Sequence, residues 1–293
     1  MGKVRAKLMW GRTMRENDSL ATGGAAAQDD LDPLSSAVRQ RDRHVVQMVS
    51  DAVDNSNAML AFQPVVAAGR NVRPAFYEGL IRILDGSGRI IPARDFILQV
   101  EPLELGRRID TIALRLGLEA LRRHPDLRLS INLSALSIGF PPWTKELNAG
   151  FARDDTVAER LILEITESSA ITAPRLVSDF ICTLQDRGVA FALDDFGSGY
   201  TSMRYLKDFC FDILKMDGEF CHGVSNNPDN MALVKAMISI GTHFDMLTVA
   251  EHVETQQDAN TLIGLGVDCL QGYLYGAPTI RPKWETCRTV STG

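Results

Sequence analysis

Acidic and amide side chains close a series of short apolar runs along this chain. They are Glu78, Asn132, Glu164, Asp194, Asp195, Glu251 and Gln271, and the cation Lys215 closes a further run. Carboxylates gathered within a few ångströms cannot all stay ionised, because each negative charge raises the proton affinity of the others. Such a group binds protons or cations, and oxygen ligands without cysteine or histidine suit hard ions such as magnesium or manganese.

The adjacent pair Asp194–Asp195 could serve two ions at once, since two-metal sites hold their ions about 3.5–4 Å apart and share a ligand. Phosphate-ester hydrolysis is the reaction that this arrangement serves best. Each acid also has an ordinary reading, as a helix cap, a surface ion pair or part of a turn. The recurrence of polar side chains at successive runs favours one shared site.

Eight apolar runs, separated by amphipathic stretches long enough for helices, must position these groups. The runs are 61–66, 75–83, 128–132, 161–165, 190–194, 212–216, 246–251 and 269–274. Strands that alternate with helices predict an α/β fold, a (β/α)8 barrel of the TIM type, which carries its chemistry at the carboxyl ends of its strands.

The link between the first two runs is too short for a parallel connection. Only about eight residues, including Gly69 and Pro74, separate them, whereas a parallel crossover needs about a dozen or more. The first strand is therefore expected to pair antiparallel with the second, which modifies the barrel. This reversal brings the early part of the first strand, with Gln63, to the rim where the other strands end.

Composition excludes several classes of protein. The 293 residues carry 31 basic and 37 acidic side chains, a formal charge of −6, so no global positive field favours a long nucleic acid. No run approaches the roughly 18 apolar residues of a membrane span, and the first residues lack a secretion signal, so a cytoplasmic location is expected. Five cysteines without a C-x-x-C pair argue against a disulfide framework and a zinc ribbon.

The chain is expected to divide into four segments. Residues 1–37 have few large apolar groups and are predicted to be a disordered arm, with an anchor for acidic lipid as the alternative. A lead-in helix is predicted at 38–57, the barrel at 58–283 and a short tail at 284–293. Regulation would come through the arm, an unknown partner or dimerisation.

Seven motifs in order resemble the EAL family of cyclic di-GMP phosphodiesterases, which act in bacterial signalling. The first is E-x-L-x-R at 78–82, where Gly79 stands in place of the naming alanine. The others are N-L-S-A at 132–135, L-E-I-T-E at 163–167, D-D-F-G-S-G-Y at 194–200, L-K-x-D at 214–217, A-E-x-V-E-T at 250–255 and Q-G-Y-L at 271–274. The family folds as a barrel with an antiparallel first strand.

The resemblance implies a set of roles for the site residues. The metal ligands would be Glu78, Asn132, Glu164 and Asp194 for one Mg²⁺ or Mn²⁺, and Asp194, Asp195 and Glu251 for a second. The catalytic residues would be Lys215, Glu251 and Gln271, with Glu167 steadying the loop that begins at Asp194. The substrate contacts would be Gln63, Glu78, Leu80, Arg82 and Asp195. Water attacking phosphorus between the ions would open cyclic di-GMP to linear pGpG.

The resemblance also bears on His252 and on the expected assembly. His252 stands where the family usually has glycine, so its imidazole is expected to displace Glu251 or add a titrating neighbour if glycine is needed there. Family members often dimerise near the loop that begins at Asp194, so the resemblance implies a homodimer with residues 196–205 and the following helix as the interface. The alternative to an enzyme is a catalytically quiet module that binds cyclic di-GMP or a protein partner.

Overall fold

The computed structural model describes residues 33–69, 72–199, 206–282 and 284. The chain divides into two units, residues 1–40 and 41–293, and the strands all belong to the second. Helix α1 spans Pro33–Asp54, where the sequence predicts 38–57. Most of the predicted arm and tail, and residues 200–205 of the predicted dimer loop, lie outside the described residues, so the domain boundaries stay predictions.

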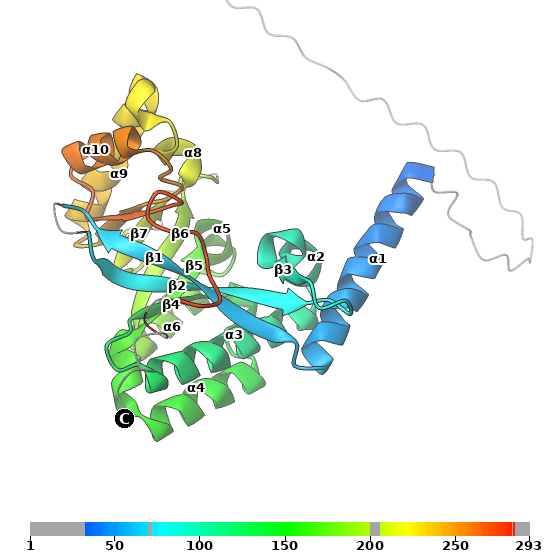
Figure 1. The fold of residues 1–293 in the computed structure, drawn as a ribbon. Helices are drawn as coiled ribbons and strands as arrows, with labels where there is room; N and C mark the ends of the chain where they lie inside the picture. The colour runs from blue at the N-terminus through cyan, green and yellow to red at the C-terminus, as the bar shows by residue number, and fades with distance from the viewer. Residues whose placement is uncertain (1–32, 70–71, 200–205, 283, 285–293) are drawn as a thin grey trace, which may run out of the picture. The chain divides into compact units, whose positions relative to one another are not determined.

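Eight of the strands in the described residues close into a barrel (Figure 1). They are β1 (Ala58–Ala67), β2 (Pro74–Leu84), β4 (Leu129–Asn132), β5 (Leu161–Thr166), β6 (Ala190–Phe196), β7 (Ile213–Met216), β8 (Leu247–Ala250) and β9 (Cys269–Gln271). The order runs β1-β9-β8-β7-β6-β5-β4-β2, and pairing of β1 with β2 closes it. All eight predicted runs are strands, and the predicted modified TIM barrel is confirmed.

Strand β1 is antiparallel to both of its neighbours, as the short link after it predicts. Its residues pair with β2 and β9, while every other pairing between barrel strands is parallel. Gln63 pairs with Glu78 on β2, and Val65 pairs with Gln271 on β9. The reversed strand therefore places Gln63 level with Glu78, in the middle of β1 rather than in its early part.

A short hairpin that the sequence analysis missed extends β2. Strand β3 (Ile90–Pro92) pairs antiparallel with the end of β2, and the 3₁₀ turn η1 (Ala93–Asp95) and helix α2 (Ile97–Val100) follow it. The Asp85 carboxylate accepts hydrogen bonds from the backbone N–H groups of Ser87 and Arg89 at 2.9 and 3.0 Å. The Asp85-Gly86 pair was the available turn signal, but a three-residue strand shows no periodicity.

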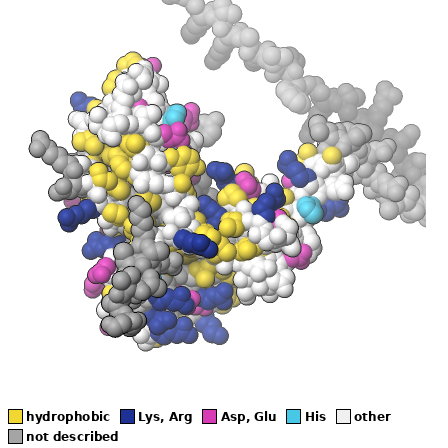
Figure 2. Space-filling view, viewed as in Figure 1, with side chains coloured by type: hydrophobic (Ala, Val, Ile, Leu, Met, Phe, Trp, Pro, Cys, Tyr) yellow, Lys and Arg dark blue, Asp and Glu magenta, His cyan; other side chains and the backbone are white. Residues whose placement is uncertain are grey.

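Helices surround the strands and carry much of the positive charge. They are α3 (Glu104–Arg123), α4 (Pro141–Arg153), α5 (Glu167–Thr172), α6 (Pro174–Gln185), α8 (Gly218–Cys221), α9 (Pro228–His243) and α10 (Gln256–Leu265), with 3₁₀ turns η2 (Ala135–Ser137), η3 (Asp155–Arg160) and η4 (Val224–Asn226). Figure 2 shows Lys and Arg side chains gathered over α3 and α4 at the lower edge of the view. None of the described helices is both long and apolar enough to cross a membrane.

A layer of apolar side chains inside the barrel forms a cluster that is distinct from the larger hydrophobic core. This layer, termed the apolar floor, consists of the buried residues Val65, Phe76, Ile162, Ala192, Ile213, Val249 and Cys269. Seven of the eight barrel strands contribute one residue each. Because side chains alternate between the two faces of a strand, the next inward residue lies two positions further along.

Candidate metal centre and catalytic site

A polar layer lies directly above the apolar floor, one inward position nearer the mouth of the barrel. Its buried members are Glu78, Glu164, Asp194, Lys215, Glu251 and Gln271, each two residues after a floor residue, and Gln63, two residues before one on the reversed β1. On β4, Asn132 lies two residues after the fully buried Ser130. The period of two in the strands thus brings these groups together.

The ammonium group of Lys215 lies at the centre of the carboxylates. Lys215 Nζ is 2.6 Å from Glu164 Oε2, 2.8 Å from Asp194 Oδ1 and 2.8 Å from Glu251 Oε1, and 3.6 Å from Glu78 Oε2. The Lys215 side chain is 1% exposed. One fixed cation therefore faces four acids in a site that is largely closed to water.

The shifted pKa values show that one lysine does not balance this charge. Burial, which alone would lower the pKa of Lys215, is outweighed by the surrounding carboxylates, and the pKa lies well above its usual value. Burial raises the pKa of Glu164 well above its ordinary value and that of Glu251 to about 8, against the opposing effect of Lys215. Burial and the neighbouring Asp194 raise the pKa of Asp195 to about 6. The cluster is short of positive charge.

Glu78 is the acid that its neighbours support best. Its Oε1 accepts a hydrogen bond from Asn132 Nδ2 at 2.9 Å, and its Oε2 accepts one from Gln271 Nε2 at 2.6 Å. Burial raises the pKa of Glu78, but Lys215 and these two donors outweigh it, so the net pKa is lowered. Gln271 Nε2 also lies 3.3 Å from Gln63 Oε1, which joins the predicted Gln63, Glu78, Asn132 and Gln271 in one network.

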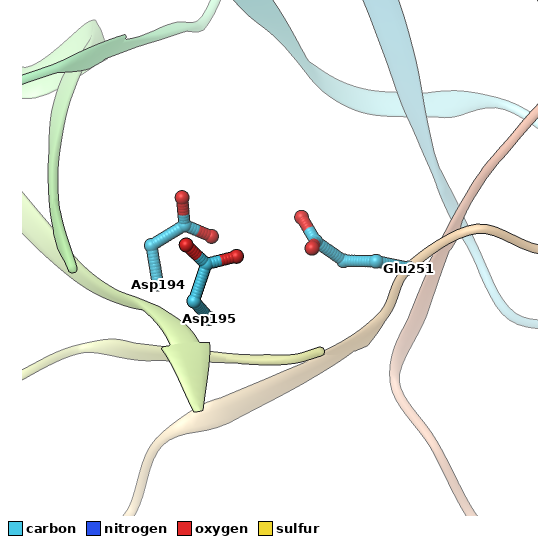
Figure 3. A group of neighbouring side chains, drawn as sticks. All are labelled: Asp194, Asp195 and Glu251. Carbon is cyan, nitrogen blue, oxygen red and sulfur yellow. The ribbon is translucent and has the colours of Figure 1, made fainter. Parts of the chain in front are cut away.

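A distortion of β6 turns two consecutive acids toward the same space. The pairing of β6 with β7 shifts register between Leu193 and Phe196, and Asp195 has a left-handed backbone with φ of 54°. Successive side chains of a regular strand point to opposite faces. In Figure 3 the carboxylates of Asp194 and Asp195 lie side by side and face that of Glu251.

The donor set fits the hard divalent ions that the sequence predicts. Asp194, Asp195 and Glu251 each offer a carboxylate oxygen, and these oxygens lie within 4.8 Å of one another. The buried Glu164 Oε1 accepts no hydrogen bond from the described residues, which is costly unless a cation or proton binds there. An all-oxygen set that lacks positive charge suits Mg²⁺ or Mn²⁺.

Glu167 accepts a hydrogen bond from the turn that follows Asp195. It begins α5 directly after β5 and is 4% exposed. Its Oε2 accepts a hydrogen bond from the backbone N–H of Gly197 at 3.0 Å. This bond ties the turn that carries Asp194 and Asp195 to the neighbouring strand.

Leu80 and Arg82 lie outside the Lys215 cluster. They follow Glu78 by two and four residues on β2, so the alternation of the strand places all three on one face. Arg82 is partly buried, and its Nη1 donates to the carbonyl of Ile81 at 2.9 Å. Burial and the nearby Arg94 lower the pKa of Arg82. Both residues therefore lie on the face of β2 that carries Glu78, beyond the polar layer.

His252 does not displace Glu251, a displacement that the sequence led us to expect because His252 replaces the usual glycine of the family. Glu251 stays in the cluster, 2.8 Å from Lys215 Nζ, and the His252 side chain is exposed. The backbone of His252 is left-handed, with φ of 53°, which costs a residue other than glycine roughly 1–2 kcal/mol. A Cβ atom on Gly218 would lie 2.0 Å from His252 Nδ1 and 2.7 Å from its Cβ. Gly218 thus makes the room that the imidazole occupies.

This pairing predicts a compensating double mutant. Gly218→Ala is expected to destabilise the protein by about 1–3 kcal/mol, as overpacking usually does, whereas the same change in a His252→Gly background should cost less than about 0.5 kcal/mol. Urea denaturation of the four proteins measures both values. Equal costs of Gly218→Ala in the two backgrounds would show that the imidazole does not fill this space.

Two motif glycines reflect close packing around the site. Gly272, with φ of 158°, lies against the backbone of Val253, whose oxygen would be 2.1 Å from a Cβ atom. A Cβ atom on Gly79 would approach Ile131 Cδ1 to 2.7 Å. The absence of the usual alanine methyl at position 79 is therefore matched by the bulk of Ile131 on the neighbouring β4.

One buried acid near the site escaped the sequence analysis. Asp110 lies on the apolar face of α3 and is 9% exposed. Its Oδ2 accepts hydrogen bonds from the Ser134 backbone N–H and the Ser137 hydroxyl, in the loop that follows Asn132. A charged residue among the apolar positions of a helix was the signal that could have identified it.

Comparison with known proteins places this site in a family. The model of the EAL domain matches residues 46–278. The cyclic di-GMP phosphodiesterase PdeB of Shewanella oneidensis is 30% identical over 268 residues, which are 90% of this chain and 31% of PdeB. The cyclic di-GMP phosphodiesterase PdeF of Escherichia coli is 29% identical over 80% of this chain and 32% of PdeF. The chain spans about a third of the length of these relatives.

Solved structures share the fold. The EAL domain of FimX from Pseudomonas aeruginosa, bound to c-di-GMP, superposes with a TM-score of 0.74 at 23% identity, over 81% of this chain and 97% of that one. The c-di-GMP complex of the PaMucR phosphodiesterase gives a TM-score of 0.70 at 30% identity, over 78% of this chain and 99% of that one.

Proposed function

The chain belongs to the EAL domain family, and on that premise we propose that it is a metal-dependent phosphodiesterase that hydrolyses cyclic di-GMP to linear pGpG. The observation that carries this proposal is the polar layer around Lys215. Its acids, its amides and Lys215 lie on, or directly after, the eight barrel strands, and the resemblance assigns a role to each of them. A module that only binds the nucleotide has no need of a buried lysine among four carboxylates.

The proposed ion ligands divide into two groups that share Asp194. Glu78, Asn132, Glu164 and Asp194 would hold one Mg²⁺ or Mn²⁺, and Asp194, Asp195 and Glu251 would hold a second. When bound, the two ions would supply Lewis acidity for the attack of water on phosphorus. Two observations support this division: Glu164 Oε1 accepts no hydrogen bond from the part of the chain that the structure describes, and the oxygens of Asp194, Asp195 and Glu251 face one another.

The other residues of the polar layer would orient and stabilise the reactants. Lys215 carries a fixed positive charge within 3 Å of three of the acids, so it can offset negative charge that develops on the phosphoryl oxygens. Gln271 Oε1 is buried and accepts no hydrogen bond from the described residues, which suits it to hold a water. Glu167 would keep Asp194 and Asp195 in place through Gly197.

The substrate would lie along β1 and β2 at the mouth of the barrel. Arg82 can bind a phosphate through two N–H groups, Leu80 offers an apolar contact beside it, and Gln63 and Asp195 offer hydrogen bonds. We further propose that the protein acts in the cytoplasm as a homodimer, with the segment 196–205 and the following helix as the interface, and that an unknown partner regulates it.

Incubation of the purified protein with cyclic di-GMP and Mg²⁺ or Mn²⁺ tests the proposal. Chromatography should show pGpG, whose formation EDTA stops and added Mn²⁺ restores. Binding of cyclic di-GMP without any pGpG would instead identify the protein as a receptor. Absence of both binding and product would reject both functions.

A further inference from the structure

The loop that follows Asn132 is held along its whole length by hydrogen bonds. The backbone N–H of Leu133 donates to the carbonyl of Glu164 at 2.8 Å. Ser134 N donates to Asp110 Oδ2 at 3.1 Å, and Ala135 N donates to the Ser169 hydroxyl at 2.8 Å. Since backbone groups at the end of a strand need such partners, the loop conformation is fixed from three different elements.

Asp110 accepts two of the hydrogen bonds that hold this loop. Its Oδ2 accepts from Ser134 N and also from the Ser137 hydroxyl at 2.6 Å, so one carboxylate oxygen joins the start and the end of the loop. Ser137 is fully buried. Burial raises the pKa of Asp110 to about 7, against the effect of these two donors. A carboxyl group in an apolar helix face is costly, which indicates that the loop needs it.

The loop in turn determines where the Asn132 side chain can lie. Asn132 is the last residue of β4 and lies two residues before Ser134. Its amide reaches Glu78 Oε1 at 2.9 Å, so a shift of the loop would change the positions of two proposed ion ligands together. Asp110 itself lies on α3, outside the polar layer.

We propose that Asp110 is a positioning residue for the first metal ion, acting through the loop 133–137 on Asn132. This inference rests on the proposed metal-dependent function. It assigns to Asp110, for the loop after β4, the kind of support that Glu167 gives to the turn after β6. Helix α5 contacts both segments. Its Glu167 accepts a hydrogen bond from the turn after β6, and its Ser169 accepts one from the loop 133–137.

The test is Mn²⁺ binding to the substrate-free protein, measured by the electron paramagnetic resonance of free Mn²⁺. Asp110→Leu is expected to weaken the tighter Mn²⁺ site about 10–100-fold, the usual effect of losing a residue that orients a ligand. Asp110→Asn keeps the shape and one acceptor oxygen, so it should stay within about threefold of the native protein. Ser137→Ala, which removes a single donor, should give an intermediate loss and serves if Asp110→Leu does not fold.

Asp258→Asn and Asp258→Leu are the matched controls. Asp258 is a 2% exposed carboxylate on α10 whose oxygens accept from Ser225 N at 2.9 Å, from Gly223 N at 3.3 Å and from the Thr255 hydroxyl at 2.7 Å. It thus supports a loop without a proposed ion ligand. The Asp258 variants should lose thermal stability but keep native Mn²⁺ affinity.

The outcomes separate this inference from the proposed function. Native Mn²⁺ affinity in folded Asp110→Leu or Ser137→Ala, or an equal loss in Asp258→Leu, would overturn the positioning role even if the protein hydrolyses cyclic di-GMP. Failure of the native protein to bind Mn²⁺ would overturn both. Native Mn²⁺ binding without turnover, together with the expected loss in Asp110→Leu, would support the positioning role and reject only the enzyme.

Discussion

Replacement of Lys215 by methionine is expected to lower the rate of cyclic di-GMP hydrolysis about 100–1000-fold, the scale of losing a preorganised donor at a reacting centre. The metal-free protein should also lose about 3–5 kcal/mol of stability, because removal of one partner leaves buried charges uncompensated. Four carboxylates surround the ammonium group, three of them within 3 Å. Methionine preserves most of the volume of the side chain.

Thermal denaturation with and without Mn²⁺ distinguishes charge from packing in this variant. Divalent ions should raise the Tm of Lys215→Met more than that of the native protein, since they replace the missing positive charge in the cluster. Lys235→Met, an exposed change on α9, controls for the general loss of a lysine and should leave rate and Tm unchanged. Native stability and turnover in Lys215→Met would exclude the central role of this lysine.

Asp195→Asn is expected to reduce turnover by a similar factor of about 100–1000 while leaving the fold intact. The substitution keeps the shape of the side chain, and asparagine tolerates the left-handed backbone at this position. Asp194 raises the pKa of Asp195, so loss of one charge relieves repulsion, and the Tm of the metal-free protein should stay equal or rise. The product assay and thermal denaturation measure these two effects.

Asp268→Asn provides the contrasting case at the other end of the barrel. Asp268 Oδ2 accepts from the backbone N–H and the hydroxyl of Thr248 at 2.8 and 2.7 Å. This variant should lose stability by about 1–3 kcal/mol, the cost of weakening hydrogen bonds to a charged group, yet keep its rate.

Full turnover in Asp195→Asn would remove that residue from the proposed ion ligands.

The sequence predicts the barrel and the meeting of its polar groups because both depend on local patterns. Strand alternation relates Glu164 to Ile162 and Lys215 to Ile213, and the short first link determines the direction of β1. The register shift at β6 and the left-handed Asp195 follow from tertiary pairing, which a single strand does not encode. The same holds for Asp110, whose partners Ser134 and Ser137 belong to a different element.

The contact between His252 and Gly218 shows why a comparison of single positions with the family motif does not predict the effect of His252. His252 departs from the family pattern, so the sequence alone predicts a disturbance of Glu251. The space for the imidazole comes from Gly218, on a helix that follows a different strand. Such a compensation is visible only when the two segments are placed side by side.

The apolar floor also limits how this barrel can change over evolutionary time. Deletion or insertion of one residue within a strand, before its polar residue, would exchange the inward and outward faces of the rest of that strand. A carboxylate would then point into the apolar core between the strands and the helices, and an aliphatic side chain would point into the site. Length variation should therefore be confined to the connecting segments. Proteins that evolve from this barrel would therefore gain new specificities by substitution of side chains at fixed strand positions, and not by a shift of strand register.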